Sequence, residues 1–250
     1  MNENEPLISG LKRRARETIR AALPAAAAVS VAWFVLSAVL SILSRRVSGC
    51  DTLYGALEEE FRRVSEAGAA AMDFASYTAL VREHASFAGS LLALALDLCR
   101  LVAGAGFAWS CLALARGEKP AWHSVFDSFG QLFKLVRLHI LISVFTCLWG
   151  LLFIFPGIIA AFRFSMAVYV MRDHPDYGAL RCIRESKELM RGRKADLFIL
   201  RLSFSLWLVL AFAIFYFSGF DILSLWLNLY AGVSTAGFYL AVSRGKIVNS

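Results

Sequence analysis

The feature that most constrains this chain is its long apolar stretches without a formal charge. Residues 140–155 and 202–220 contain no Asp, Glu, Lys or Arg. A helix needs roughly 20 apolar residues to cross the hydrocarbon core of a bilayer. Over 250 positions the chain is 58% hydrophobic and 18% charged, whereas soluble domains have about 25% charged residues. The sequence therefore predicts an all-α, polytopic membrane protein, folded as a single membrane domain over residues 1–250.

Six stretches are predicted to be transmembrane helices, at about 23–43, 87–115, 138–155, 158–171, 197–218 and 222–242. The first stretch is flanked by basic residues, and Arg45 and Arg46 follow it. A cleavable signal peptide has a shorter apolar core of about 7–15 residues and a small-residue cleavage site. We therefore expect 23–43 to be retained as the first helix.

The third and fourth stretches meet at Pro156-Gly157 and together hold more than thirty mostly apolar residues. That length exceeds a single crossing, and Pro followed by Gly punctuates a helix. The sequence predicts a tight helical hairpin of two crossings here, and the alternative is one kinked helix.

Three polar segments separate the apolar stretches. Residues 44–86 mix Glu, Asp and Arg with Ala, which favours a helical, solvated connector. Two other segments have the apolar spacing of three and four that is typical of short amphipathic helices at the membrane surface. One contains Trp122, Val125, Phe126, Phe129, Leu132 and Phe133; the other, within 172–196, contains Leu180, Ile183 and Met190.

Lys and Arg in the loops predict the orientation, because cytosolic loops carry an excess of them. Six crossings place both termini on one side, together with the basic segments around 12–20, 116–137 and 172–194. The opposite side has five arginines, all within 44–86, and none in the two tight turns. We expect a multi-pass protein of the cytoplasmic membrane with both termini cytosolic and 44–86 outside the cytosol.

Four charged residues lie inside predicted crossings, where charges are costly and are functional candidates by default. They are Asp97, Arg100, Arg163 and Arg201. Asp97 and Arg100 are three residues apart and share a helix face, so Asp97 is predicted to pair with Arg100, Arg163 or both. Either a buried packing pair or a polar site for an ion, proton or anionic lipid would result. Arg201 is predicted to be an anchor whose long stem reaches the headgroups.

Other chemistry has little support in the sequence. The chain has no GxSxG, HExxH, GxxxxGK[ST] or GxGxxG motif, so no catalytic residue is predicted. Five scattered Cys and four scattered His predict neither a disulfide framework nor a metal site, and no cofactor is expected. The net charge of +7 lies in clusters beside apolar runs, which favours anionic lipid headgroups over nucleic acid as partners.

Several motifs in the second half of the chain resemble one bacterial family. They are Ala115-Arg116-Gly117-Glu118-Lys119-Pro120 with Phe126 and Phe129, then Phe155-Pro156-Gly157-Ile158-Ile159, Ser165-Met166-Ala167-Val168-Tyr169, Glu185-Ser186-Lys187 and Leu189-Met190-Arg191-Gly192. From about Ala113 onward the chain resembles the integral-membrane group catalogued as domain of unknown function 975. The resemblance implies a multi-span membrane protein and no established activity. The 44–86 connector and Arg201 do not match the family pattern.

The function predicted from these observations is a non-enzymatic scaffold, partner-binding or regulatory module of the membrane. A membrane protein partner or a second copy of the chain would be its natural contact. The alternative is a small transporter or permease subunit that uses Asp97, Arg100 and Arg163. Only one Pro-Gly break is evident, whereas transporters often repeat broken helices in both halves. A lipid-modifying enzyme is a third hypothesis, supported by location alone.

Overall fold

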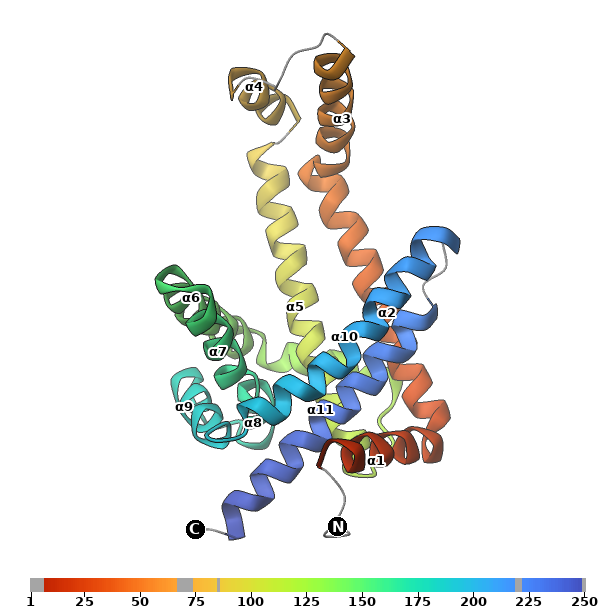
Figure 1. The fold of residues 1–250 in the computed structure, drawn as a ribbon, viewed down its shortest axis with the longest axis vertical. Coiled ribbons are helices and arrows are strands. Elements are labelled where there is room, and N and C mark those ends of the chain that lie inside the picture. Colours follow the sequence, from red (N-terminus) through yellow and green to blue (C-terminus); the bar gives the residue numbers. More distant parts are fainter. Residues whose placement is uncertain (1–6, 67–73, 85, 219–221, 249–250) are drawn as a thin grey trace. The chain divides into compact units, whose positions relative to one another are not determined.

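The computed structural model describes residues 7–66, 74–84, 86–218 and 222–248, and within these residues the chain is helical without a strand (Figure 1). The prediction of an all-α protein is confirmed for this part. The elements are α1 (Leu7–Ala21), α2 (Leu23–Ser48), α3 (Cys50–Glu66), α4 (Phe74–His84), α5 (Phe87–Ala115), the 3₁₀ helix η1 (Trp122–Gln131), α6 (Leu132–Leu152), α7 (Ile154–Phe164), α8 (Ala167–Asp173), α9 (Ala179–Leu189), α10 (Lys194–Ser218) and α11 (Ile222–Val248).

Five helical stretches in the described residues are long and apolar enough to cross a membrane. They are Leu23–Ser48, Phe87–Ala115, Trp122–Leu151, Phe155–Asp173 and Leu223–Arg244. The remaining predicted crossing, 197–218, coincides with α10, where the side chains at 208 and 212–218 lie outside the description. The number of six crossings therefore stays a prediction.

The chain divides into two compact units, and each is described by itself. One comprises Met1–Phe34 with Val102–Ser250, and the other comprises Val35–Leu101. In the smaller unit, the described residues of the polar connector form α3 and α4, which pack on each other. The ends of α2 and α5 approach closely there, because a Cβ added at Gly89 would meet the Val47 carbonyl oxygen.

In the larger unit, the basic N-terminal segment forms a helix that the sequence analysis did not predict. Leu11, Ala15 and Ile19 are buried at a spacing of four, which places them on one face of α1. α1 packs on α10 and α11, and the Tyr230 hydroxyl donates to the Lys12 carbonyl oxygen at 3.2 Å. Burial lowers the pKa of Lys12, and the charge of Arg16 acts in the same direction.

The helix break near Pro156 lies before the Pro-Gly pair. α6 ends at Leu152, Phe153 is extended, and α7 starts at residue 154. Pro156 is the third residue of α7, where its missing N–H removes no hydrogen bond because the first four helical N–H groups lack partners. α6 and α7 pack on each other at glycines, since a Cβ on Gly157 would lie 2.8 Å from the Gly150 Cα.

The amphipathic segment after Pro120 is helical, as predicted, and its residues Trp122–Gln131 form a 3₁₀ helix that leads into α6. Its buried residues, Val125 and Ser128, are three apart, which is the spacing of one 3₁₀ turn. The Val125 carbonyl oxygen lies against Gly106 of α5, where any Cβ would collide with it. The absence of a side chain at Gly106 therefore allows the backbone of η1 to lie directly against α5.

Candidate functional site

The junction between α7 and α8 is fixed by a side chain from α9. A break in a helix leaves backbone groups without their usual partners. Here the Ser186 side chain is the hydrogen-bond partner of two such groups. Its hydroxyl donates to the Arg163 carbonyl oxygen at 2.8 Å and accepts from the Met166 N–H at 3.1 Å. Ser186 has no exposed surface. The two hydrogen bonds hold α9 against the junction.

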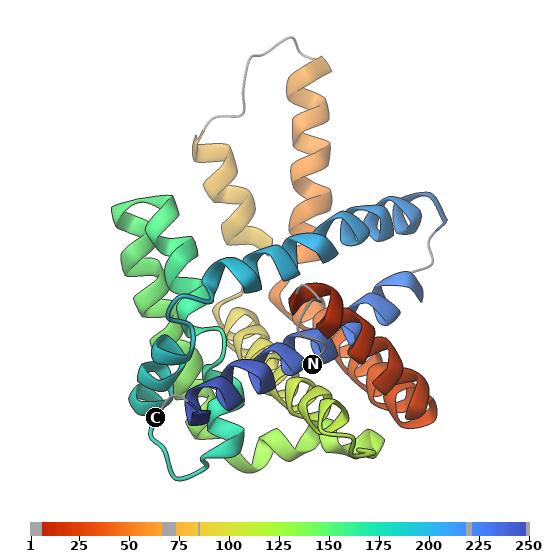
Figure 2. The same cartoon turned by 60° about the horizontal axis from the view of Figure 1, so that its bottom comes forward.

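α9 has a buried face and a charged face, as predicted for an amphipathic helix, but Leu180, which was predicted on the apolar face, is 53% exposed. Its buried residues are Ala179, Cys182, Ile183, Ser186 and Leu189, and it packs on α6, α7 and α8 (Figures 1 and 2). Burial raises the pKa of the Cys182 thiol. Because the thiolate is the reactive form, this cysteine is an apolar packing residue rather than a nucleophile.

A cavity of about 680 Å³ lies where α7, α9 and the start of α10 meet. It is lined by Arg163, Arg184, Lys187, Glu188, Arg191 and Lys194. Gly192 has a φ of +75°, a conformation that residues with a Cβ rarely adopt. The turn at Gly192 lets the chain reverse within a few residues, so that Arg191 and Lys194 both line the cavity.

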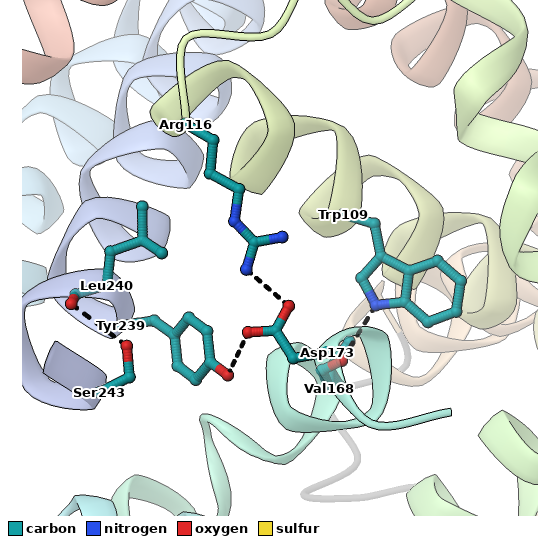
Figure 3. A network of polar contacts seen from close by, with 7 residues as sticks. All are labelled: Trp109, Arg116, Val168, Asp173, Tyr239, Leu240 and Ser243. Atoms are coloured by element: carbon teal, nitrogen blue, oxygen red, sulfur yellow. Dashed lines mark hydrogen bonds and ion pairs between the residues drawn. The ribbon is translucent and has the colours of Figure 1, made fainter. Parts of the chain in front are cut away.

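A second polar network joins three helices of the same unit (Figure 3). Arg116, just after α5, forms an ion pair with Asp173 of α8 at 2.6 Å. The other carboxylate oxygen of Asp173 accepts a hydrogen bond from the Tyr239 hydroxyl of α11 at 2.8 Å. The Trp109 indole N–H donates to the Val168 carbonyl oxygen at 3.0 Å. These contacts connect α5, α8 and α11, and each carboxylate oxygen of Asp173 has a partner.

The comparison with known families bears on this region. Residues 152–246 match the family described as Protein of unknown function (DUF975). The resemblance predicted from the motifs is confirmed for this segment, which covers less than half of the chain. The motif from Ala115 to Pro120, with Phe126 and Phe129, lies outside the match. No curated protein and no solved structure matches the chain.

The DUF975 segment contains every residue that lines the cavity, including the predicted candidate Arg163. Arg201, the other candidate in this segment, is the eighth residue of α10, and its guanidinium lies 5.5 Å from the centre of the Phe162 ring. That distance allows a cation–π contact. The anchoring role predicted for Arg201 is untested.

Asp97 and Arg100 lie in the smaller unit, outside the DUF975 segment. Their side chains form the predicted pair at 3.4 Å, and the Ser44 hydroxyl donates to Asp97 at 3.2 Å. Both side chains are about half exposed in the protein, at 47% and 46%. A bridge from Asp97 to Arg163 would join the two units and stays a prediction.

Sequence reasoning missed the two features that organise the site. Glu185-Ser186-Lys187 was noted as a motif, but nothing in its composition indicated that Ser186 would serve a helix break twenty residues earlier. The basic residues at 184, 187 and 191 follow helical spacing, which predicts one charged face without predicting a cavity. In the described residues, no group of three or more His, Cys, Asp or Glu could hold a metal ion.

Proposed function

We propose that this protein is a multi-pass helical protein of the cytoplasmic membrane that acts as a non-enzymatic binding module, either a scaffold or a regulator. In this proposal it has six crossings, with α6 and α7–α8 forming two of them, joined by the tight turn at Phe153. Both termini and α9 face the cytosol, and α3 and α4 lie on the opposite side.

One observation carries the proposal: a preformed basic surface is held at the end of an apolar helix. The stretch Phe155–Asp173 is apolar enough to cross a membrane, and α9 follows it with its charged face exposed. The Ser186 hydrogen bonds fix α9 before any partner binds. Rigid presentation of a charged face lowers the entropic cost of binding, and it suits recruitment of an anionic partner.

The polar groups near the apolar helices support a binding role over a transport role. Arg116, Asp173 and Tyr239 are all engaged in bonds that join helices. Transporters instead place polar groups around a substrate path near the bilayer midplane.

A labelling experiment tests the topology. Single-cysteine chains would carry either native Cys50, which is exposed at the start of α3, or Arg181→Cys on α9. A membrane-impermeant maleimide is expected to label Cys50 in intact cells and the α9 cysteine only in inverted vesicles. Labelling of both from the same side, or release of the chain from membranes by alkali without detergent, would contradict the proposal.

A second experiment separates binding from transport. In the first part, the chain is crosslinked in membranes and purified in mild detergent, and the mass of the complex is measured. In the second part, the same chain is reconstituted in liposomes and ion flux is measured. A binding module yields a stoichiometric complex with a membrane protein or a second copy, and no flux. The alternative, a small transporter or permease subunit, has one observation in its favour: the half-exposed Asp97–Arg100 pair with its Ser44 contact. Flux that is lost in Asp97→Asn would establish that alternative.

A further inference from the structure

We infer that the cavity between α7, α9 and the start of α10 binds a net-anionic phosphate group at the membrane surface. The inference deepens the proposed function by naming the chemistry of the partner, and it rests on the cytosolic, membrane-level position of α9 in that proposal.

The charge of the cavity is the first argument. Three arginines and two lysines line it, against the single carboxylate of Glu188. Asp196 lies nearby, but its carboxylate pairs with Arg193 at 3.6 Å. Asp196 and Arg193 do not line the cavity. In the part of the chain that the structure describes, the lining therefore carries a large excess of positive charge. Such an excess favours an anion with more than one negative oxygen.

The types of side chain point to phosphate. Arg presents five N–H donors in a planar fork that matches two oxygens of a phosphate, and Lys adds a point charge with three donors. A tetrahedral phosphate can accept from several such donors that arrive from different directions. Here they come from α7 (Arg163), from α9 (Arg184, Lys187) and from the turn into α10 (Arg191, Lys194).

The backbone around the cavity is fixed before any ligand binds. Ser186 holds the carbonyl group of Arg163 itself, so the cavity residue of α7 and the helix that carries Arg184 and Lys187 are joined by a 2.8 Å hydrogen bond. The left-handed turn at Gly192 sets the positions of Arg191 and Lys194. The cavity, about 680 Å³ in volume, is open to solvent, since Arg184, Lys187 and Arg191 are exposed, and it has room for a phosphate group.

The surroundings favour a phosphate that arrives on a lipid. Lys194 begins α10, and the apolar residues Phe198 and Ile199, one turn later, are 47% and 49% exposed. Phe198 is four residues after Lys194 and so lies on the same helix face. A basic cavity beside an apolar helix face matches a headgroup with its acyl chains, and basic pockets between transmembrane helices bind such headgroups.

The test uses the full chain, purified in mild detergent. Binding is measured by native mass spectrometry and by the rise in thermal unfolding temperature on addition of phosphatidic acid, phosphatidylcholine or inorganic pyrophosphate. We expect phosphatidic acid to bind and to stabilise the protein, and zwitterionic phosphatidylcholine to have little effect. Binding of phosphatidic acid alone identifies a lipid as the source of the phosphate; equal binding of pyrophosphate identifies a soluble phosphate compound.

Two double variants with the same change in charge locate the site. Arg184→Gln with Lys187→Gln removes two cavity cations, and we expect phosphate affinity to fall about tenfold or more, because charge-assisted hydrogen bonds are lost. Arg20→Gln with Arg181→Gln removes two exposed cations outside the cavity, one at the end of α1 and one on α9, where Arg181 stacks on Tyr177. Affinity of this control should stay within about twofold.

Three results would overturn the inference. They are the absence of anion binding by a folded, membrane-extracted chain, an equal loss in both double variants, and an unchanged affinity in the cavity variant. Because the exposed positions 184 and 187 do not lie in the packed core, gel filtration and unfolding temperature report whether each variant folds. A failure of phosphate binding leaves the proposed binding module standing, because the labelling and flux experiments test that proposal separately. Ion flux would overturn the binding module while leaving the phosphate site intact, whereas labelling of α9 from the outside would overturn both.

Discussion

Arg116 and Asp173 form a 2.6 Å ion pair that joins the chain just after α5 to the last residue of α8 (Figure 3). The two residues are 57 positions apart in the sequence, and their side chains are 36% and 23% exposed. Removing one member of a partly desolvated pair destabilises the protein by more than the pair itself contributes, because the remaining charge is left without a partner. This pair and the Tyr239 hydroxyl together hold α5, α8 and α11 in one arrangement.

The first prediction concerns this pair. Asp173→Asn leaves the Arg116 guanidinium unpaired and weakens the acceptor of Tyr239, so the free energy of unfolding should fall by about 1–3 kcal/mol. Thermal unfolding of the purified protein in detergent measures the loss. Adding Arg116→Gln removes the orphaned charge, so the double variant should lose less than the sum of the single variants. Strict additivity would mean that the two residues do not interact.

The second prediction concerns Ser186. Ser186→Ala removes a single oxygen atom but leaves both the Arg163 carbonyl and the Met166 N–H without this partner in a buried site. Each unsatisfied group costs about 1–3 kcal/mol, so unfolding temperature and phosphate affinity should fall together. Ser205→Ala is a matched control, because the Ser205 hydroxyl donates only to Leu202 of its own helix at an exposed position. Its effect should remain within about 0.5 kcal/mol.

The third prediction concerns the contact of α5 with η1. In Gly106→Ala the new methyl group meets the Val125 carbonyl, and backbone cannot move away as a side chain can. We expect a loss of about 1–3 kcal/mol in the free energy of unfolding. In Gly104→Ala, two residues earlier, the new methyl would lie 3.3 Å from the Trp33 ring, which can rotate slightly, so the loss should be smaller. Equal losses at both positions would contradict the close backbone approach.

The sequence predicted the apolar helices because the bilayer imposes one requirement on every crossing, a long uncharged stretch. It placed the break between α6 and α7 within a few residues, since Pro156 marks a helix start or stop, but it could not tell which. The sequence predicted a short amphipathic helix at η1 but not its 3₁₀ geometry, because apolar spacing does not separate the two helix types over ten residues.

The cavity lay beyond sequence reasoning for a different reason. Arg163 was identified as an intramembrane charge and paired in prediction with Asp97, because depth along a helix can be estimated whereas the neighbours of a helix cannot. The structure places Arg163 beside Arg184 and Lys187, a grouping that depends on how Ser186 and Gly192 arrange α7, α9 and α10. α1 was missed because its apolar residues are few and its charges dominate the composition.

The last prediction tests both partners proposed for Asp97. In lipid an unpaired charge is costly, so Asp97→Asn and Arg100→Gln should each reduce the amount of folded chain in the membrane. The double variant leaves no unpaired charge and should accumulate better than the sum of the single losses. The double variant Asp97→Asn with Arg163→Gln tests in the same way whether Asp97 pairs with Arg163. Quantifying detergent-extracted, monodisperse protein measures these four variants together with Arg163→Gln as the remaining single variant. If only the double variant with Arg100→Gln recovers, Asp97 pairs with Arg100 alone, as in the 3.4 Å contact. If the double variant with Arg163→Gln recovers, the bridge to Arg163 is established. If neither recovers, Asp97 does not depend on either arginine.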